Sequence, residues 1–253
     1  MSAKIDIDFL TSQYFYFDLP VPYKLSDGQE ITLEPLMLDK SEIFLSSVGL
    51  LTIDKNSSSD VNIIQMSYLQ YIADVLITQS AVSKQQFINI LGLCLKFLHP
   101  HIQRDNRNRP IIVDKDIKIT TKDFEDIRRI ILHQNIPHYN DEYINPDMKA
   151  AMAEIDYLKN KNVDVPNIER KMAIITAHCG LGKKEQMQMT YRSHTLLFEE
   201  VCGEVNYMVN KPIALWSNQG DKVDNWIYKT KQNKMDNYFK DLHSYQKAVG
   251  TTN

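Results

Sequence analysis

Apolar and polar residues alternate with a period of about two along residues 14–38. This is the pattern of strands that bury one face, and aromatic and β-branched residues are frequent in it. Asp27-Gly28 interrupts the run, and this pair favours a tight turn because it tolerates positive φ angles. We therefore predict a β-hairpin. Its three prolines have no backbone N–H to donate to a neighbouring strand, so at least one arm should lie at a sheet edge or end early.

Beyond this hairpin the hydrophobic period lengthens to about 3.6, which predicts helices. Asp60 is positioned to cap a helix over 61–77, Ser83 one that runs to Leu98, and Thr120 or Thr121 one that ends before Pro137. The remaining predicted helices cover residues 40–51, 146–161, 166–179 and, as the longest, 183 to just before Pro212. Gly180 is positioned to be the C-cap of the helix over 166–179.

These elements predict an α+β protein that is mainly α, with a small N-terminal β-hairpin or sheet followed by a helical body. We divide the chain into a β-containing region at 1–55, a helical region at 56–103 and a mainly helical region at 104–253. The last region has a short hairpin at 110–119. The loop over 99–110 marks the boundary, although the pattern is also compatible with one continuous domain.

The composition is that of a soluble globular protein of 253 residues with a net charge of -3. Positive and negative side chains are thus nearly equal in number, which argues against the broad basic surface of a dedicated nucleic-acid binder. Cys94, Cys179 and Cys202 are far apart and odd in number, which favours a reducing, cytoplasmic site of synthesis over a disulfide framework. No segment reaches the roughly 18 consecutive apolar residues of a membrane span.

The longest predicted helix carries one continuous apolar stripe with a histidine inside it. The members recur at alternating spacings of four and three: Met187, Tyr191, His194, Phe198, Val201, Val205 and Met208. Cys202 lies about 12 Å from His194 along a helix axis, too far to act as a nucleophile that the imidazole activates. We interpret residues 183–209 as a packing or docking helix, and His194 as a partly buried residue with one hydrogen-bond partner.

Residues 133–143 form the most ligand-rich loop, with His133, His138, Asp141 and Glu142 close together. Their spacing matches no metal motif with a known mechanism, so we favour a solvated interhelical loop and leave metal binding open. The adjacent His178 and Cys179 lack a second ligand pair, and a turn between helices explains the glycines that follow. Neither group indicates a cofactor. The usual nucleotide-binding and hydrolase motifs are missing from the sequence, and we predict no enzyme activity.

Two basic stretches leave a choice between nucleic acid and protein as partner. Arg104, Arg107 and Arg109 lie in one short loop, where their guanidinium groups suit phosphate or carboxylate. The C-terminal tail interleaves lysines with aromatic residues, a composition found in single-strand binders and in helices that dock on partner proteins. We favour protein docking because the chain does not concentrate positive charge.

Several stretches together resemble proteins from the structural and tail-morphogenesis block of tailed bacteriophages of Gram-positive hosts. The resemblance rests on PYKLSDGQEITLEPLMLDKSEIFLSS (22–47) with VNIIQMSYLQYIADVL (61–76), then on DFEDIRRIILHQNIPHYNDEYINPDMKAAM (123–152), and finally on MTYRSHTLLFEEVCGEVNY (189–207) with WIYKTKQNKMDNYF (226–239). It implies a tail assembly chaperone, an α-rich protein that keeps the long helical tape-measure protein soluble, or a structural baseplate or tail component. It brings no catalytic signature.

The sequence therefore predicts a non-enzymatic virion-morphogenesis protein that acts in the host cytoplasm or within the virion. Its partners would be tape-measure or baseplate components, or a second copy of the chain, with no membrane contact and no cofactor. The alternatives are a structural tail component and a nucleic-acid-binding phage protein. The residues that we predict to bind the partner are Met187, Tyr191, Phe198, Trp226, Tyr228, Tyr238 and Phe239.

Overall fold

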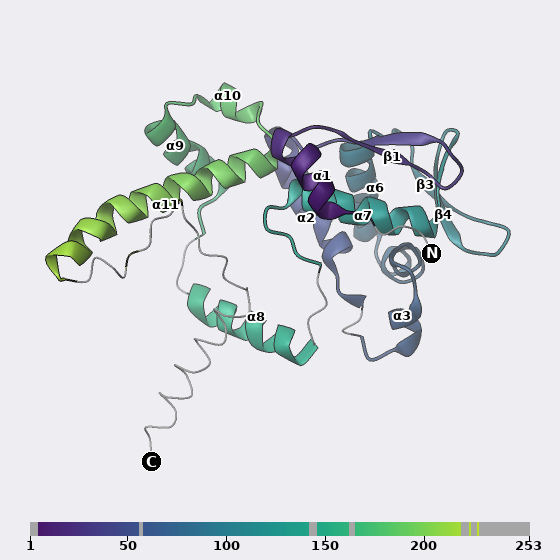
Figure 1. Cartoon of the computed structure of the whole chain (residues 1–253). Coiled ribbons are helices and arrows are strands. Elements are labelled where there is room, and N and C mark those ends of the chain that lie inside the picture. Colours follow the sequence, from purple (N-terminus) through teal and green to yellow (C-terminus); the bar gives the residue numbers. More distant parts are fainter. Residues whose placement is uncertain are drawn as a thin grey trace, which may run out of the picture. The chain divides into compact units, whose positions relative to one another are not determined.

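The computed structural model describes residues 5–55, 58–141, 146–161, 165–218, 223 and 227. The described chain is mainly helical and contains a two-stranded and a three-stranded antiparallel sheet (Figure 1), which confirms the predicted α+β, mainly α fold. The chain divides into two compact units. The first unit consists of Met1–Glu142 and Leu181–Leu196, and the second of Tyr143–Gly180 and Leu197–Asn253.

The predicted N-terminal hairpin is confirmed, and it belongs to the first unit. β1 (Val21–Lys24) pairs antiparallel with β2 (Glu30–Leu33). Gly28 has a φ of 93°, a backbone conformation that costs glycine little, and the carbonyl of Gln29 accepts a 2.8 Å hydrogen bond from the amide of Leu25. Because the sheet has two strands, both are edge strands, the position predicted from the prolines of this segment.

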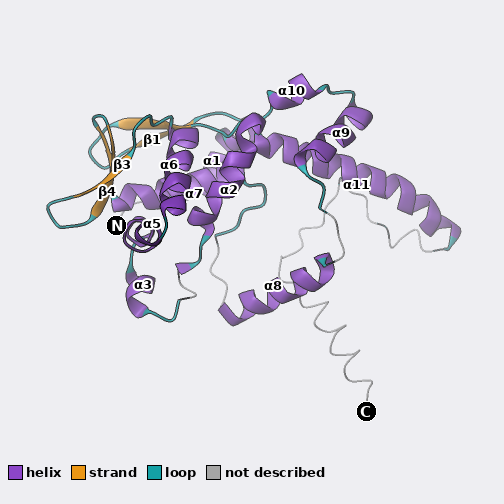
Figure 2. Ribbon diagram, turned by 180° about the vertical axis from the view of Figure 1, so that it is seen from behind, coloured by secondary structure: helices purple, strands orange, loops and turns teal. Residues whose placement is uncertain are grey.

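The core of the first unit lies between its longer helices, α2 (Ser41–Thr52), α6 (Ala81–Leu95) and α7 (Thr121–Asn135), with the strands on one side of them (Figure 2). Phe44 on α2, Phe87 on α6 and Phe124 on α7 are 0–2 % exposed. The rings of Phe87 and Phe124 meet edge to face at 5.8 Å. Burying each such side chain contributes roughly 1.5–3 kcal/mol to folding.

Buried polar groups of α7 hold the hairpin against the core. Thr120 caps α7 as predicted, in a capping box with Asp123. Asp123 is 2 % exposed and also accepts a 3.0 Å hydrogen bond from the amide of Ser26 in the hairpin turn. At the other end of α7, the Asn135 side-chain oxygen accepts a 2.7 Å hydrogen bond from the amide of Leu36. These contacts join segments about 100 residues apart and fix where β2 ends.

The helix predicted over 61–77 is wrong as a continuous element. Asp60 caps α3 (Val61–Gln65) as expected, but Met66 is extended and Ser67 starts a new helix with a capping box of its own. That second helix consists of α4 (Tyr68–Tyr71), the π-helical turn η4 (Ile72–Leu76) and α5 (Ile77–Gln79). The next helix, α6, is capped by Ser80 rather than by Ser83. A serine at either position can cap the first turn of a helix, so the sequence did not decide where this helix begins.

The three-stranded sheet of the first unit consists of β3 (His101–Arg104), β4 (Pro110–Asp114) and β5 (Ile117–Ile119). All neighbours pair antiparallel, so β4 and β5 form a hairpin within residues 110–119. Short 3-10 turns, Phe15–Phe17 after α1 (Ile7–Gln13) and Leu38–Lys40 before α2, complete the N-terminal part.

The second unit contains α8 (Pro146–Asn160), α9 (Ile168–Cys179) and most of α11 (Tyr191–Trp216). Gly180 ends α9 with a φ of 73°, which confirms its predicted role as the C-cap. The Lys171 ammonium on α9 lies 5.4 Å from the centre of the Phe198 ring on α11. His178 and Glu204 pair at 3.1 Å between the same two helices. No helix among the described residues is long and apolar enough to cross a membrane.

The single helix predicted from 183 to just before Pro212 is wrong at both ends. The chain forms α10 (Lys183–Met187), turns over Gln188–Thr190 and then forms α11 through Pro212 to Trp216. The hydroxyl of Thr190 accepts a hydrogen bond from the amide of Ser193 and so caps the new helix. Proline costs one backbone hydrogen bond within a helix, and α11 tolerates that loss.

Candidate functional site

The segment that returns to the first unit, Leu181–Leu196, is held there by backbone and side-chain hydrogen bonds. Thr190 forms an isolated β-bridge with Met37, and the amide of Tyr191 donates to the carbonyl of Leu36 at 2.8 Å. The carboxylate of Asp18 accepts hydrogen bonds of 2.7 Å from the hydroxyls of both Thr190 and Ser193. The first turns of α11 are therefore a fixed part of the first unit.

His194 lies inside this anchored segment and is fully buried. Its Nε2 is 3.1 Å from the side-chain oxygen of Gln186, which is also fully buried. This confirms the interpretation of His194 as a packing residue with a hydrogen-bond partner.

The predicted apolar stripe of α11 divides into a packed half and an exposed half. His194 and Val201 are buried, and Tyr191 and Phe198 are half-buried. Beyond Val201 the same face is open to solvent. It carries five large apolar side chains that recur with the period of the helix: Val205, Met208, Val209, Ile213 and Trp216. We call these five residues the exposed α11 stripe.

The exposed α11 stripe is strongly apolar and nearly uncharged. Met208 is 65 % exposed and Trp216 is 93 % exposed. Between Val205 and Trp216 the sequence has one charged residue, Lys211, whose ammonium donates a 3.1 Å hydrogen bond to the carbonyl of Val223. A contiguous apolar surface of this kind marks a site of protein contact more often than does a scatter of single residues.

The second half of this stripe was not predicted. The predicted helix ended before Pro212, so the predicted stripe did not include Ile213 and Trp216. The signal was present, because the spacing of three and four continues through Val209, Ile213 and Trp216. Because proline usually ends a helix, the predicted helix stopped there in spite of this spacing.

The residues predicted to bind a partner have different locations. Met187 is 41 % exposed but lies on α10, outside the stripe. Tyr191 packs against the core of the first unit, and Phe198 lies beneath Lys171. The four tail aromatics fall outside the described residues: Trp226, Tyr228, Tyr238 and Phe239.

The ligand-rich loop forms a polar cluster on α7. Asp141 pairs with the Arg129 guanidinium at 2.5 Å and lies 3.5 Å from Nε2 of His133. The ring of Tyr139 meets that of His133 edge to face at 5.0 Å. Burial lowers the pKa of His133 below its usual value, and the charge of Asp141 opposes that shift only in part. The cluster therefore surrounds a half-buried imidazole with structural contacts.

The predicted group also included His138 and Glu142. His138 is exposed with a φ of 58°, and Glu142 lies outside the described residues. No group of three or more histidine, cysteine, aspartate or glutamate side chains within the described chain is placed to hold a metal ion. His178 pairs with Glu204, while the neighbouring Cys179 is exposed.

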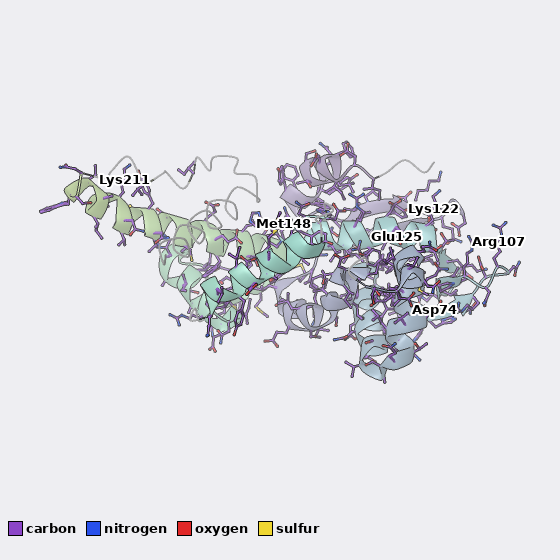
Figure 3. The ribbon with its side chains drawn as sticks, turned by 90° about the horizontal axis from the view of Figure 1, so that it is seen from below. Asp74, Arg107, Lys122, Glu125, Met148 and Lys211 are labelled. Atoms are coloured by element: carbon purple, nitrogen blue, oxygen red, sulfur yellow. The ribbon has the colours of Figure 1, made fainter. Side chains whose placement is uncertain are left out.

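The three predicted basic residues lie on the hairpin between β3 and β4. Arg104 is paired with Asp74, and Arg109 with Asp105 at 2.7 Å. Arg107 projects from the outer end of the hairpin (Figure 3). Carboxylates thus neutralise much of the positive charge that the sequence places here.

The chain matches no protein-family model, and comparisons with curated proteins and with solved structures found no match. The functional argument therefore depends on the residues and geometry described above.

Proposed function

We propose that this chain is a non-enzymatic virion-morphogenesis protein that binds a helical segment of a partner through the exposed α11 stripe. The single observation that carries the proposal is the stripe itself, five large apolar side chains on one helix face with little charge around them. The resemblance to phage tail-morphogenesis proteins suggests the partner. It would be the tape-measure protein, and the chain would be its assembly chaperone.

The chemistry of the stripe supports a protein partner. Tryptophan dominates the energetics of many interfaces because one rigid side chain removes a large area from water, and Trp216 is almost fully exposed. Met208 is flexible and polarizable, a property that suits surfaces which adapt to a partner. Burying apolar area contributes about 25 cal/mol per Å² before the costs of association are subtracted.

The spacing of the stripe supports a helical partner in particular. Residues three and four apart lie on one narrow face, which is the seam that a second helix packs against. Such a seam requires apolar positions on the partner at the same spacing, and long tape-measure helices offer them. Because the seam has almost no charge, its complex should survive raised salt.

The proposal is tested by recovering the tagged protein from phage-infected cells at low and raised salt, alongside mass spectrometry of purified virions. Recovery of tape-measure protein at both salt concentrations, with the chain missing from virions, supports a chaperone. A fixed copy number in virions makes the chain a structural tail or baseplate component instead. Salt-sensitive capture of nucleic acid without any tail protein contradicts both.

A further inference from the structure

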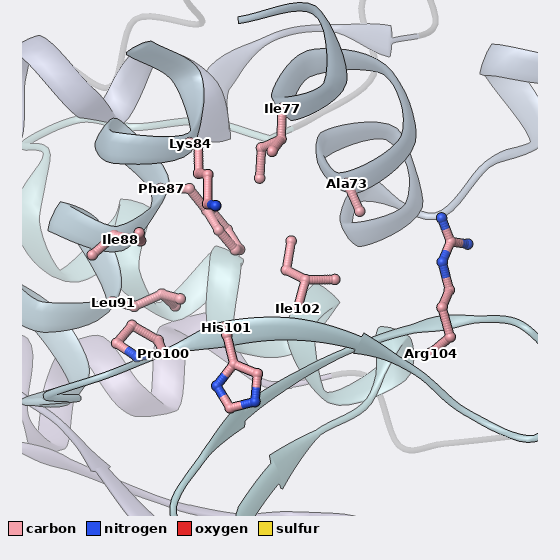
Figure 4. A pocket seen from close by; sticks show the side chains of 10 residues that line it. All are labelled: Ala73, Ile77, Lys84, Phe87, Ile88, Leu91, Pro100, His101, Ile102 and Arg104. Carbon is pink, nitrogen blue, oxygen red and sulfur yellow. The ribbon is translucent and has the colours of Figure 1, made fainter. Parts of the chain in front are cut away.

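A cavity of about 520 Å³ opens in the first unit between the η4–α5 segment, α6 and β3 (Figure 4). It is independent of the exposed α11 stripe. Its lining is mostly apolar and comes from Ala73, Ile77, Lys84, Phe87, Ile88, Leu91, Pro100, His101, Ile102 and Arg104. Sites for small organic molecules have this size and this balance of apolar wall and few polar groups.

The floor of the cavity is formed by buried, closely packed side chains. Phe87 and Leu91 on α6 are 2 % and 1 % exposed, and the Phe87 ring is fixed by its edge-to-face contact with Phe124. Ile77 and Ile102 face each other across the cavity and are only half-buried. A preformed apolar wall lowers the entropic cost of ordering a ligand, so the site needs no rearrangement to bind one.

One wall of the cavity is a π-helical turn, η4, which contributes Ala73. π-turns are rare and occur frequently at functional sites, because the wider turn displaces a helix from its regular path. Asp74 in the same turn pairs with Arg104 on β3, which fixes the spacing between the helix and the strand at this end of the cavity. The small Ala73 side chain keeps the interior open.

The cavity carries a positive charge that no carboxylate of the described chain neutralises. Arg104 is neutralised by Asp74, and the His101 ring lies on the opposite side of β3 from Ile102. Lys84 extends from α6 toward the cavity beside Phe87, and it has no ion-pair partner among the described residues. An apolar cavity with the ammonium group of Lys84 at its wall complements a molecule that has an apolar body and one anionic group.

We infer that this cavity binds a small organic acid, with its carboxylate at Lys84 and its aliphatic body against Phe87, Leu91 and Ile102. A cationic molecule with the same body is excluded by the charge of Lys84. A fully polar anion lacks the apolar contacts that provide most of the affinity.

The test is isothermal titration of the full chain with decanoate below its micelle concentration, with decyltrimethylammonium as the molecule of opposite charge. We expect saturable binding of one decanoate per chain and none of the cation. Lys84→Met should weaken decanoate binding about tenfold, since it removes the charge and keeps the apolar stem. Lys122→Met, which removes an exposed lysine of α7 outside the cavity, should leave it unchanged.

A second variant, Ala73→Leu, fills the cavity and should abolish binding while the circular dichroism spectrum stays that of the parent. Lys84 is exposed, so the result for Lys84→Met stands even where Ala73→Leu fails to fold. The inference is overturned by any of three results: no saturable binding of decanoate, equal affinity in the parent and Lys84→Met, or equal binding of the cation. Recognition of an acidic apolar peptide in place of decanoate also rejects it.

Discussion

The carboxylate of Asp18 accepts a 2.7 Å hydrogen bond from the hydroxyl of Thr190, across 172 residues of sequence. Its second oxygen accepts one of the same length from Ser193. Asp18 has a φ of 54°, a left-handed conformation that aspartate and asparagine tolerate better than most residues. One side chain in an unusual backbone position therefore holds the start of α11 in the first unit, while the end of the helix presents the exposed α11 stripe.

Asp18→Asn should lower the free energy of unfolding by about 1–2 kcal/mol, because the amide can accept from only one of the two hydroxyls. Thr190→Val removes one donor and the hydroxyl that caps α11, and should cost a similar amount. Urea unfolding of both single variants and the double variant measures their coupling. Because the residues share one hydrogen bond, the double variant should lose less than the sum. Strict additivity would show that the contact contributes nothing.

The stability of the protein should fall as the pH drops below the ordinary pKa of histidine, about 6.5. Burial lowers the pKa of His133 in the folded state, so the unfolded chain binds more protons in this range. The stability is present above pH 6.5 and is lost progressively below it. Urea unfolding between pH 7 and pH 5 should show this slope, and His133→Gln should reduce it. An unchanged slope in the variant would mean that another group titrates.

Thiol reactivity should separate the three cysteines. Cys94 is buried, and burial raises the pKa of its thiol to about 12, so it carries little thiolate at pH 8. Cys179 and Cys202 are exposed, although burial raises the pKa of Cys202 to some extent. A disulfide-exchange reagent such as DTNB should titrate two thiols in the folded protein and a third only in guanidinium. Rapid reaction of all three thiols without denaturant contradicts the described core.

The hydrophobic pattern predicted the fold class and most of the local structure, and the reasons for its misses are physical. The Asp27-Gly28 turn, the Thr120 cap and the Gly180 C-cap depend on a few neighbouring residues, and each occurs where the sequence placed it. The break at Gln188–Thr190 depends instead on contacts with Asp18 and the residues around Met37. Contacts between distant segments leave no periodic signal.

The same distinction applies to the candidate sites. The α11 stripe has a helical period, so its existence could be predicted, although a proline near its end hid the second half. Which half is packed and which is exposed follows from tertiary contacts alone. The cavity beside Lys84 had no signal in the sequence, because it arises where a π-turn, a helix and a strand meet.

Val209→Asp should weaken binding of the partner at least tenfold, because it places a charge in the centre of the exposed α11 stripe. Val209 is 54 % exposed, so the free energy of unfolding should change by no more than about 0.5 kcal/mol. The matched control is Ala214→Asp, which adds the same charge to the same helix on the side opposite the stripe, since no stripe residue lies three or four positions from Ala214.

The affinity of purified tape-measure protein for each of these two variants and for the parent provides the readout. A loss shared by Val209→Asp and Ala214→Asp would reflect net charge and not the stripe. Size-exclusion chromatography with light scattering distinguishes a second copy as the occupant. In that case Val209→Asp would change the oligomeric state of the purified chain in the absence of any tail protein.

The central claim is that the exposed α11 stripe contacts a helical partner, and site-specific photo-crosslinking in phage-infected cells tests it most directly. A benzophenone amino acid replaces Val209 in one variant and Ala214, on the opposite side of α11, in the other, and mass spectrometry identifies the crosslinked peptides. We predict that position 209 crosslinks to a helical segment of the tape-measure protein and that position 214 does not. Equal crosslinking from both positions, or no crosslink to a tail protein from position 209, would contradict the claim.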